Sequence, residues 1–404
     1  MIAEISFKNF FSFKEESVFS FEADDAYGIS EDLVVDLGPV RLLKVAVVYG
    51  ANASGKSNLV ATCRFIKHFT SYDPKDRDVP IALIPFLFTK SGRDSVAEFS
   101  VSFYPLFDST VKRYTYSAKL SRQEVREESL VINAGESDES LIFRRSLEDH
   151  GLSVIEFSDS SGLDKDVQQM LTVQCLPNMS VLALIRRLNT RGNEISKVSD
   201  YFFAKLSCLP VNHEQSPSFY AAIKVREDAE EGEYLQQYLS AADFNIAKLS
   251  LDIESELLKV PGLSFIHQIK TDTGEVEYYA LPRQLESSGT LRTLDLAALM
   301  HEAIKNDVML VIDELDSSLH VLLTDYILSR FLRESTYAQL LITTHYSGLL
   351  DNCDLLRQDC FWFVEKDAAG VSHLYSLIEF KEIGSLPSLQ NSYQHGLFGA
   401  VPNL

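Results

Sequence analysis

Cysteine is scarce in this sequence, and no two cysteines have the close spacing that zinc sites use. The five cysteines are Cys63, Cys175, Cys208, Cys353 and Cys360. An odd number without a Cys-x-x-Cys pair argues against a disulfide framework and against a zinc site. We therefore expect reduced thiols that mostly fill the core of a cytoplasmic protein.

Basic residues are also scarce relative to acidic ones. Lys and Arg together number 37 against 58 Asp and Glu, which gives a formal net charge of −21. Proteins that coat nucleic acid need Lys and Arg surfaces, so we expect no extensive DNA-coating surface. A local basic groove remains compatible with this charge, and direct contact with DNA stays an open question at this stage.

Long apolar runs, repeats and low-complexity tracts are absent. No stretch approaches the roughly 18 apolar residues of a membrane span, and the first 21 residues lack the basic-then-apolar layout of a signal peptide. Hydrophobic residues make up 46% and charged residues 24% of the 404. This is the balance of a globular protein, and the length suggests about two to four structural units. We expect no membrane association.

The first part of the chain shows mainly β-strand patterns. Alternation over the first 35 residues predicts a β-hairpin or meander, and the apolar run 42–49 suits a buried parallel strand. A helical pattern covers 57–69. From 81 to 145 the alternation predicts an antiparallel sheet, with 86–88 among its strand-like runs.

In the later part of the chain, the spacing of apolar residues changes twice. Apolar spacings of three and four predict helices over about 160–250, and Thr271–Gly274 is typical of a hairpin turn between two strands. After Glu286 the pattern alternates helix and strand. The expected elements are a helix from about 290, a strand at 308–312, a helix at 319–333, strands at 339–343 and 361–365, and a hairpin partner at 372–378.

A glycine-rich loop follows the apolar run 42–49. It reads Gly50-Ala51-Asn52-Ala53-Ser54-Gly55-Lys56-Ser57, with Asn58 next in the following helix. This matches G-x-x-x-x-G-K-[ST] in a strand-loop-helix setting. The backbone amides and the helix dipole cradle phosphate oxygens, Lys56 supplies a charge to the β- and γ-phosphates, and Ser57 offers a hydroxyl to Mg²⁺.

Two later strands end in polar residues. The run 309–312 leads into Asp313 and Glu314, and the run 340–342 leads into a cluster that ends at His345. We expect Asp313 to hold Mg²⁺ and Glu314 to orient the attacking water. Because parallel strands end at one edge of a sheet, His345 is expected near the γ-phosphate.

A second anion-binding device is predicted at the start of the helix near 290. The turn contains Ser287, Ser288 and Gly289, and small hydroxyl residues at a helix N-terminus bind anions or simply cap the helix. Taken alone, capping is the simpler interpretation. One phosphate loop does not need a second device in the same chain, so a second copy is a natural user of this turn.

The order of these motifs resembles that of ABC-type ATPases of the SMC/RecF/OLD-like branch. Ser287–Gly289 is similar to their signature motif, Leu315–His320 to their D-loop, and His345 to their switch histidine. The stretch 7–14 resembles the opening strand of the branch. The stretches 361–367 and 396–402 resemble the tails of compact RloA- and AbiL-type ATPases of phage defence.

The resemblance implies an α/β fold: an ABC-type P-loop ATPase head with a mixed β-sheet, flanking helices, a β-rich N-terminal lobe and a helical insertion. The expected domains are an N-terminal lobe (1–150), an insertion (151–245) that is free to contact partners, and a C-terminal lobe (246–404). It also implies ATP and Mg²⁺ as ligands. Two copies, or a higher homo-oligomer, would enclose the nucleotide, with Ser287–Gly289 acting in trans. The glutamine loop is expected near 85–86.

The expected role is the sensor or regulatory subunit of a bacterial antiphage system, acting on a separate effector that in some systems is a nuclease. We expect no nuclease in this chain, because the short stretch after Asp367 holds no Asp-x-Asp pair and two-metal chemistry needs several convergent acids. Two alternatives stay open: a RecF/SMC-like DNA-repair ATPase that binds DNA directly, and a scaffold whose assembly is held by nucleotide.

Overall fold

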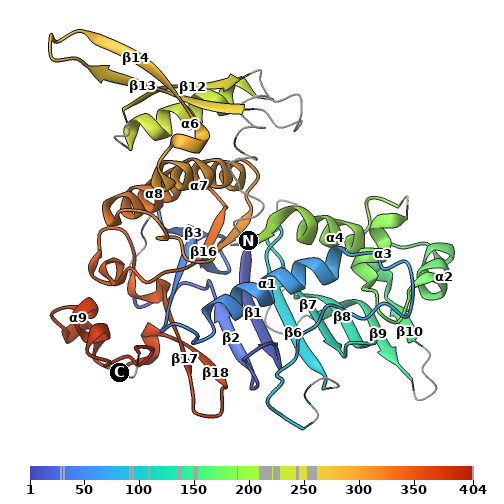
Figure 1. The fold of residues 1–404 in the computed structure, drawn as a ribbon. Coiled ribbons are helices and arrows are strands. Elements are labelled where there is room, and N and C mark those ends of the chain that lie inside the picture. Colours follow the sequence, from blue (N-terminus) through green and yellow to red (C-terminus); the bar gives the residue numbers. More distant parts are fainter. Residues whose placement is uncertain are drawn as a thin grey trace. The chain divides into compact units, whose positions relative to one another are not determined.

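The computed structural model describes most of the chain (Figure 1). The described residues are 1–27, 30, 32–90, 92, 95–107, 110–133, 139–148, 153–188, 190–208, 221, 228–242, 245–252 and 262–402. Two compact units form: the first contains 1–209, 307–313 and 336–404, and the second contains 210–306 and 314–335. These units do not divide at the expected boundaries after 150 and 245, because 151–209 belongs to the first unit and 246–404 contributes to both.

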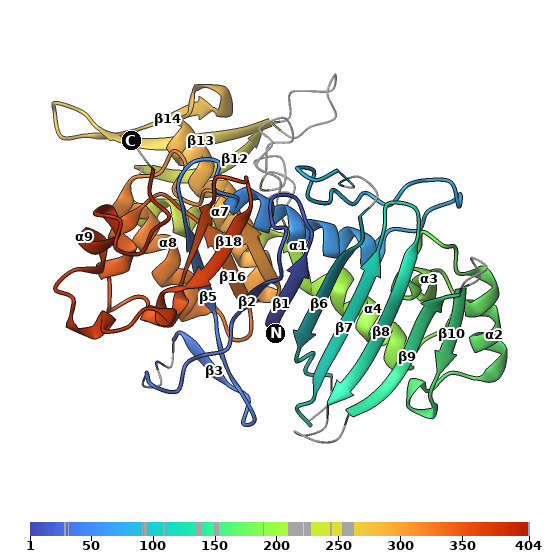
Figure 2. The same cartoon turned by 90° about the horizontal axis from the view of Figure 1, so that it is seen from below.

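A seven-stranded antiparallel sheet forms one part of the first unit (Figure 2). Its strands, in spatial order, are β10 (Ser153–Phe157), β9 (Glu139–Leu147), β8 (Val125–Asn133), β7 (Arg113–Leu120), β6 (Ala97–Phe103), β1 (Ile2–Lys8) and β2 (Ser17–Ser20). Alternate residues of β7 are buried, as period-two patterning requires. The structure confirms the predicted N-terminal hairpin and the antiparallel sheet.

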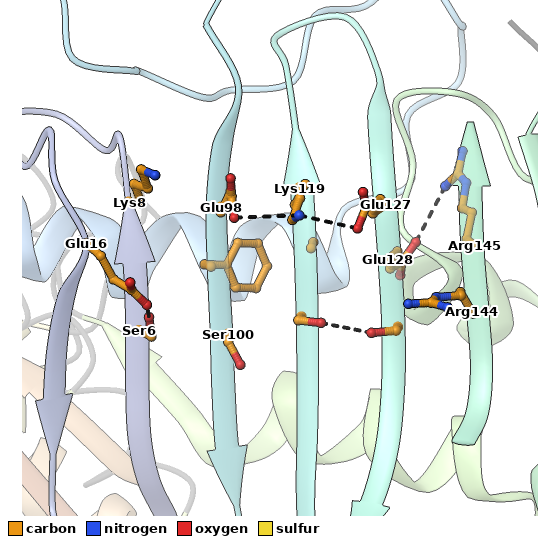
Figure 3. Close-up of a pocket in the computed structure, with 14 residues that line it drawn as sticks. Ser6, Lys8, Glu16, Glu98, Ser100, Lys119, Glu127, Glu128, Arg144 and Arg145 are labelled. Atoms are coloured by element: carbon orange, nitrogen blue, oxygen red, sulfur yellow. Dashed lines mark hydrogen bonds and ion pairs between the residues drawn. The ribbon is translucent and has the colours of Figure 1, made fainter. Parts of the chain in front are cut away.

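One face of this sheet is polar and partly exposed (Figure 3). Lys119 lies between Glu98 and Glu127, with nitrogen–oxygen distances of 3.9 and 3.5 Å, and the hydroxyls of Ser117 and Ser129 are 2.9 Å apart. These residues line a shallow hollow of about 220 Å³. Because the charged side chains are more than 40% exposed, such pairs contribute about 1 kcal/mol or less.

The opposite face carries a buried ionic network. The Tyr116 hydroxyl donates to Glu128 at 2.8 Å, and the backbone N–H of Val181 donates to both carboxylate oxygens at 2.9 and 3.2 Å. Arg145 lies 3.5 Å from Glu128 and donates to the Met179 carbonyl at 2.5 Å. Burial raises the pKa of Glu128, and Arg145 opposes the rise. The network therefore fixes the segment before Val181 against the sheet.

The second sheet of the first unit is mixed. In spatial order its strands are β11 (Leu206–Cys208), β15 (Met309–Ile312), β16 (Gln339–Thr343), β5 (Val45–Tyr49), β17 (Phe361–Lys366) and β18 (Ser372–Ser376), and all neighbours are parallel except β17 and β18. Every residue of β5, β15 and β16 is buried. Near-continuous apolar strands of this kind suit a sheet that is covered on both faces.

Helix α1 (Lys56–Ser71) lies between the two sheets. Phe65 and Phe69 pack edge-on against Phe99 of β6, at ring-centroid distances of 6.3 and 6.0 Å, and α1 also contacts β11 and β15. Buried Gln339 joins the sheets differently: its amide accepts from the Ile2 N–H at 2.6 Å and donates to the Ile2 carbonyl at 2.9 Å. Among the described residues, the other α-helices and strands of this unit are α2 (Lys165–Gln174), α3 (Val181–Arg187), α4 (Glu194–Lys205), α9 (Leu389–Gln394) and the short pair β3 (Val34–Asp36) and β4 (Arg41–Leu43).

Two local predictions are wrong. Residues 86–88 form no strand; the Phe86 N–H donates instead to the Asn9 side chain at 3.0 Å, and Phe88 is exposed. The stretch 160–250 is not uniformly helical, because Leu206–Cys208 pairs with β15 and residues from Ile246 onward form a strand. Both strands gain ladder hydrogen bonds that the local apolar spacing does not reveal.

The second unit combines a small sheet with helices. Its elements are α6 (Ala229–Ala241), β12 (Ile246–Asp252), β13 (Gly262–Lys270), β14 (Val276–Pro282), the short 3-10 helix η3 (Arg283–Leu285), α7 (Ser288–Lys305) and α8 (Val321–Glu334). The strands are antiparallel in the order β12-β13-β14. The Gly274 N–H donates to the Thr271 carbonyl at 2.9 Å, which confirms the predicted hairpin turn.

The α/β fold class predicted from the sequence is confirmed: a mixed sheet with flanking helices stands beside a β-rich N-terminal part. Within the described part of the chain, the helices are too short or too polar to cross a membrane.

Candidate nucleotide-binding site

The loop between β5 and α1 encloses the ammonium group of Lys56. This nitrogen donates to the carbonyls of Gly50 and Ala51, at 2.7 and 3.2 Å, and the side chain is only 6% exposed. A buried cation at the start of a helix adds its charge to the positive end of the helix dipole. The loop is therefore electrostatically suited to a polyanion.

No side chain caps the N-terminus of α1. The N-cap position is Gly55, whose φ of 124° lies in the region that favours glycine. The buried hydroxyl of Ser54 has no hydrogen-bond partner among the described residues. Uncapped amides and an unpartnered hydroxyl at a helix N-terminus are the donors that phosphate oxygens accept from.

Close packing explains why Gly50 and Gly55 carry no side chain. A Cβ on Gly50 would lie 2.5 Å from the Ser54 hydroxyl and equally close to the Val364 carbonyl. A Cβ on Gly55 would collide with Ser372. Substitution at either position would displace the loop.

Two serines that the sequence interpretation missed brace this loop. The Ser372 hydroxyl donates to the Ser54 carbonyl at 2.5 Å, and its oxygen lies 2.7 Å from the Ser12 hydroxyl. The Asn58 amide donates to the Ser12 hydroxyl at 2.6 Å. Ser12 stands within the opening-strand resemblance, so a signal existed for it. The sequence held no such signal for Ser372, because this residue comes from a distant hairpin.

The remaining loop residues are more open. Ala51 and Asn58 are half-buried, and Asn52, Ala53 and Ser57 are exposed. Ala53 has a φ of 63°, a left-handed backbone at the tip of the loop. The exposed Ser57 hydroxyl at the start of α1 is accessible to a ligand of the loop.

Asp313 follows β15 at the same sheet edge as the loop. Its carboxylate is buried, and its Oδ1 accepts from the Thr343 hydroxyl at 2.5 Å. Strand β16 lies between β15 and β5 and is parallel to both. Asp313 therefore stands across one strand from the loop, and Thr343, which the sequence interpretation did not single out, holds it.

His345 comes two residues after the end of β16 and is exposed. The preceding residue is tied to β5, because the Thr344 N–H donates to the Val48 carbonyl at 3.2 Å. The following Tyr346 accepts at its carbonyl from the Tyr49 hydroxyl at 3.0 Å. The structure thus brings the loop, Asp313 and His345 to one edge of one sheet.

In the second unit, the turn before α7 is both a cap and an exposed surface. The Ser287 hydroxyl accepts from the Thr290 N–H at 3.0 Å, which makes Ser287 the N-cap. Ser288 is exposed and Gly289 half-buried. Capping, the simpler interpretation of this turn, is therefore present in the structure, and it leaves the exposed Ser288 available to a ligand.

Glu314 also belongs to the second unit. Its φ is 50°, a left-handed conformation that is uncommon outside glycine. Arg292 of α7 donates to the Glu314 carbonyl at 3.2 Å. Burial lowers the pKa of Arg292, and Asp295, Asp316 and Glu314 oppose the decrease. Arg292, which the sequence interpretation missed, therefore braces the backbone of Glu314 from the helix that carries the Ser287–Gly289 turn.

The fold and the loop define a P-loop nucleotide-binding protein of the α/β class. The model of the family described as AAA domain, putative AbiEii toxin, type IV TA system, matches residues 45–351. This match covers well over half of the chain, and the chain belongs to that family. Membership of this family supports an ATPase activity.

Known structures give a more distant likeness. The SMC head domain from Thermotoga maritima is 15% identical, with 93% of this chain and 98% of that chain covered and a TM-score of 0.44. An SMC head bound to the C-winged helix domain of ScpA is 14% identical, with 94% of this chain and 99% of that chain covered and a TM-score of 0.45. No curated protein sequence matches the chain.

Proposed function

We propose that this protein binds and hydrolyses ATP with Mg²⁺, and that two copies close around the nucleotide. The observation that carries the proposal is the loop Gly50–Ser57, with the buried cation of Lys56 inside it and the uncapped N-terminus of α1 behind it. Phosphoryl transfer is catalysed mainly by positioning and charge stabilisation, which this arrangement supplies.

The proposed roles follow the chemistry of each side chain. Lys56 and the loop amides hold the phosphates, Glu314 orients the attacking water, and His345 contacts the γ-phosphate. Arg292 would set the direction of Glu314 by holding its carbonyl. A base of this kind contributes about 10²–10⁴-fold to rate.

The donor set suits Mg²⁺. Ser57 offers an exposed hydroxyl, and Asp313 a carboxylate that Thr343 orients. Hard oxygen ligands that leave room for phosphate oxygens and water are what Mg²⁺ prefers. When bound, the ion would neutralise charge that develops on the phosphates.

The exposed Ser287–Gly289 turn supports the dimer. A second copy could present this helix N-terminus to the nucleotide, adding amides and a dipole from the other side. Nucleotide would then act as a switch between closed and open dimers.

For the biological role we propose a sensor or regulatory subunit of a bacterial antiphage system, cytoplasmic and coupled to a separate effector. Support comes from the family description, which names a putative toxin, and from the resemblance of 361–367 and 396–402 to RloA- and AbiL-type ATPases. The stretch 151–245 is proposed for partner contacts, since none of the expected site residues lies within it. Comparing phage plating on cells that carry the intact operon or its Lys56→Ala form tests this role.

The test of the enzyme proposal is phosphate release with ATP and Mg²⁺. Glu314→Gln should lower turnover at least about 100-fold while retaining ATP, so the variant should accumulate as a dimer in mass photometry when ATP is added. Glu233→Gln, which changes an exposed acid on α6, should behave as wild type.

Two outcomes would contradict the proposal. Wild type that releases no phosphate above the Glu314→Gln background would remove the ATPase activity. Wild type that turns over at full rate as a monomer would remove the dimer around nucleotide.

A further inference from the structure

The C-terminal stretch 388–402 lies in the same unit as the phosphate loop. Its helix α9 is joined to η4 (Ser347–Asp351), the 3-10 helix that follows His345. The Asp351 carboxylate accepts from the Leu389 N–H at 2.7 Å and from the Ser388 hydroxyl at 2.6 Å. Asp351 therefore fastens the start of α9 to the far end of η4.

A second set of hydrogen bonds between α9 and η4 lies closer to His345. The hydroxyl of Ser347 accepts from the side-chain amides of Gln394 and Gln390, at 3.0 and 3.3 Å. Ser347 is two residues after His345. The stretch that carries the histidine is thus held by both ends of a helix from the C-terminus.

Tyr393 extends this contact to the phosphate loop itself. Its ring packs against Tyr49, the last residue of β5, at 5.4 Å between centroids. Burial raises the pKa of Tyr393 to about 12. Tyr49 directly precedes Gly50, whose carbonyl accepts from Lys56, so the Tyr393 ring contact lies at the start of the phosphate loop.

The rest of the stretch anchors α9 to the sheet. Phe398 is buried and packs on Phe363 of β17 at 5.6 Å, and the Tyr375 hydroxyl donates to the Phe398 carbonyl at 2.8 Å. Gly399 has a φ of 64°, and a Cβ there would lie 2.5 Å from the Glu365 carboxylate. The chain turns tightly at this point and brings the Ala400 carbonyl within 3.2 Å of the Tyr393 hydroxyl, which donates to it.

We propose that the stretch 388–402 is a working part of the hydrolysis site, in which Tyr393 is a positioning residue that acts through Tyr49 on the stretch carrying His345, while Gln390 and Gln394 hold the same stretch at Ser347. The proposal rests on the proposed function. Tyr49 links the two elements directly, since its ring contacts Tyr393 and its hydroxyl donates to the Tyr346 carbonyl. Tyr393 touches no reacting atom in this scheme; it acts through the loop and through His345.

The test compares two hydroxyl deletions. Tyr393→Phe keeps the ring and removes the hydrogen bond to the Ala400 carbonyl. The matched control is Tyr114→Phe, which removes a hydroxyl that donates to Glu194 at 2.6 Å in the antiparallel sheet. Because Tyr393 positions groups and does not bind substrate, kcat for ATP should fall about tenfold with KM changed less than about threefold. Tyr114→Phe should leave both constants unchanged, and Tyr393→Ala should lower kcat further.

Hydrogen exchange tests the role of Tyr393 even if the protein does not hydrolyse ATP. Amides of residues 344–352 should exchange at least about fivefold faster in Tyr393→Phe than in wild type or Tyr114→Phe. Equal exchange and equal kcat would overturn the role of Tyr393 while leaving the ATPase proposal intact. A wild type without turnover would instead remove the ATPase proposal, and the exchange rates alone would then confirm or overturn the contact between Tyr393 and this stretch.

Discussion

Helices α1 and α7 both begin at turns of small residues, yet their N-termini are built differently. The first turn of α1 follows a glycine without a side-chain cap and holds a buried lysine. The first turn of α7 is capped by Ser287 and carries exposed serines without a lysine or arginine. The amides of α1 are thus kept for a ligand, whereas one amide of α7 is already satisfied within the chain.

This difference indicates a division of labour. Anions gain most where uncapped amides, a dipole and a buried cation converge, so α1 is suited to hold the nucleotide alone. The end of α7 offers a weaker, accessible dipole that suits a second contact made after the first. Arg292 extends that contact inward, because it connects the first turns of α7 to the Glu314 carbonyl.

Removing the Lys56 cation should cause the largest loss of ATP turnover, because this cation distinguishes the N-terminus of α1 from that of α7. Lys56→Ala should lower ATP turnover about 1,000-fold, as expected for loss of a donor that faces developing charge. Nucleotide binding should weaken as well, measured with a fluorescent ATP analogue. Lys119→Ala, on the polar face of the antiparallel sheet, is the control and should retain full activity. Turnover within threefold of wild type in Lys56→Ala would mean that the loop amides suffice.

Helix α7 should make the stability of the protein depend on pH in a way that α1 does not, because α7 buries a carboxyl group. Burial raises the pKa of Asp295 to about 7, and Arg283 and Arg292 oppose the rise; its Oδ1 has no hydrogen-bond partner among the described residues. Since the folded pKa exceeds the unfolded one, stability should fall as pH rises from about 4 to 7. Asp295→Asn should therefore stabilise the protein at pH 8 by about 2 kcal/mol and by little at pH 4.

Urea midpoints at the two pH values measure this change. Asp272→Asn, at the exposed tip of the β13–β14 hairpin, provides the control and should shift neither midpoint. An equal effect of Asp295→Asn at both pH values would show that Asp295 is ionised throughout, held by the two arginines.

Much of the structure around the N-terminus of α1 was predictable from the sequence. Less of the structure around α7 was. A phosphate loop is a contiguous motif between a strand and a helix, so Gly50–Ser57 and the elements beside it followed from local pattern. The end of β15 was equally readable, because an apolar strand ending in Asp313 is contiguous too. The compact units divide at positions other than 150 and 245, since the chain returns to the mixed sheet of the first unit through β15 and β16.

The residues that brace the site could not be found in this way. Ser372 reaches Ser54 across 318 positions, and Tyr393 reaches Tyr49 from the other end of the chain. A serine or tyrosine in such a stretch has no distinguishing local pattern. The mixed sheet, with β17 beside β5 and β18 beside β17, brings these side chains together.

The smallest effect should separate capping from ligand binding at α7. Ser287→Ala removes the acceptor for the Thr290 N–H and should destabilise the first turn of α7 by about 1 kcal/mol, seen as about fivefold faster exchange of its amides. Ser288→Ala is the control, since Ser288 is exposed and is not the cap; it should leave exchange unchanged. If Ser287→Ala leaves exchange unchanged but weakens ATP-dependent dimerisation, the hydroxyl serves the nucleotide and not the helix. Faster exchange with dimerisation retained would assign Ser287 to the helix, and the contact in trans would then depend on Ser288 and Gly289.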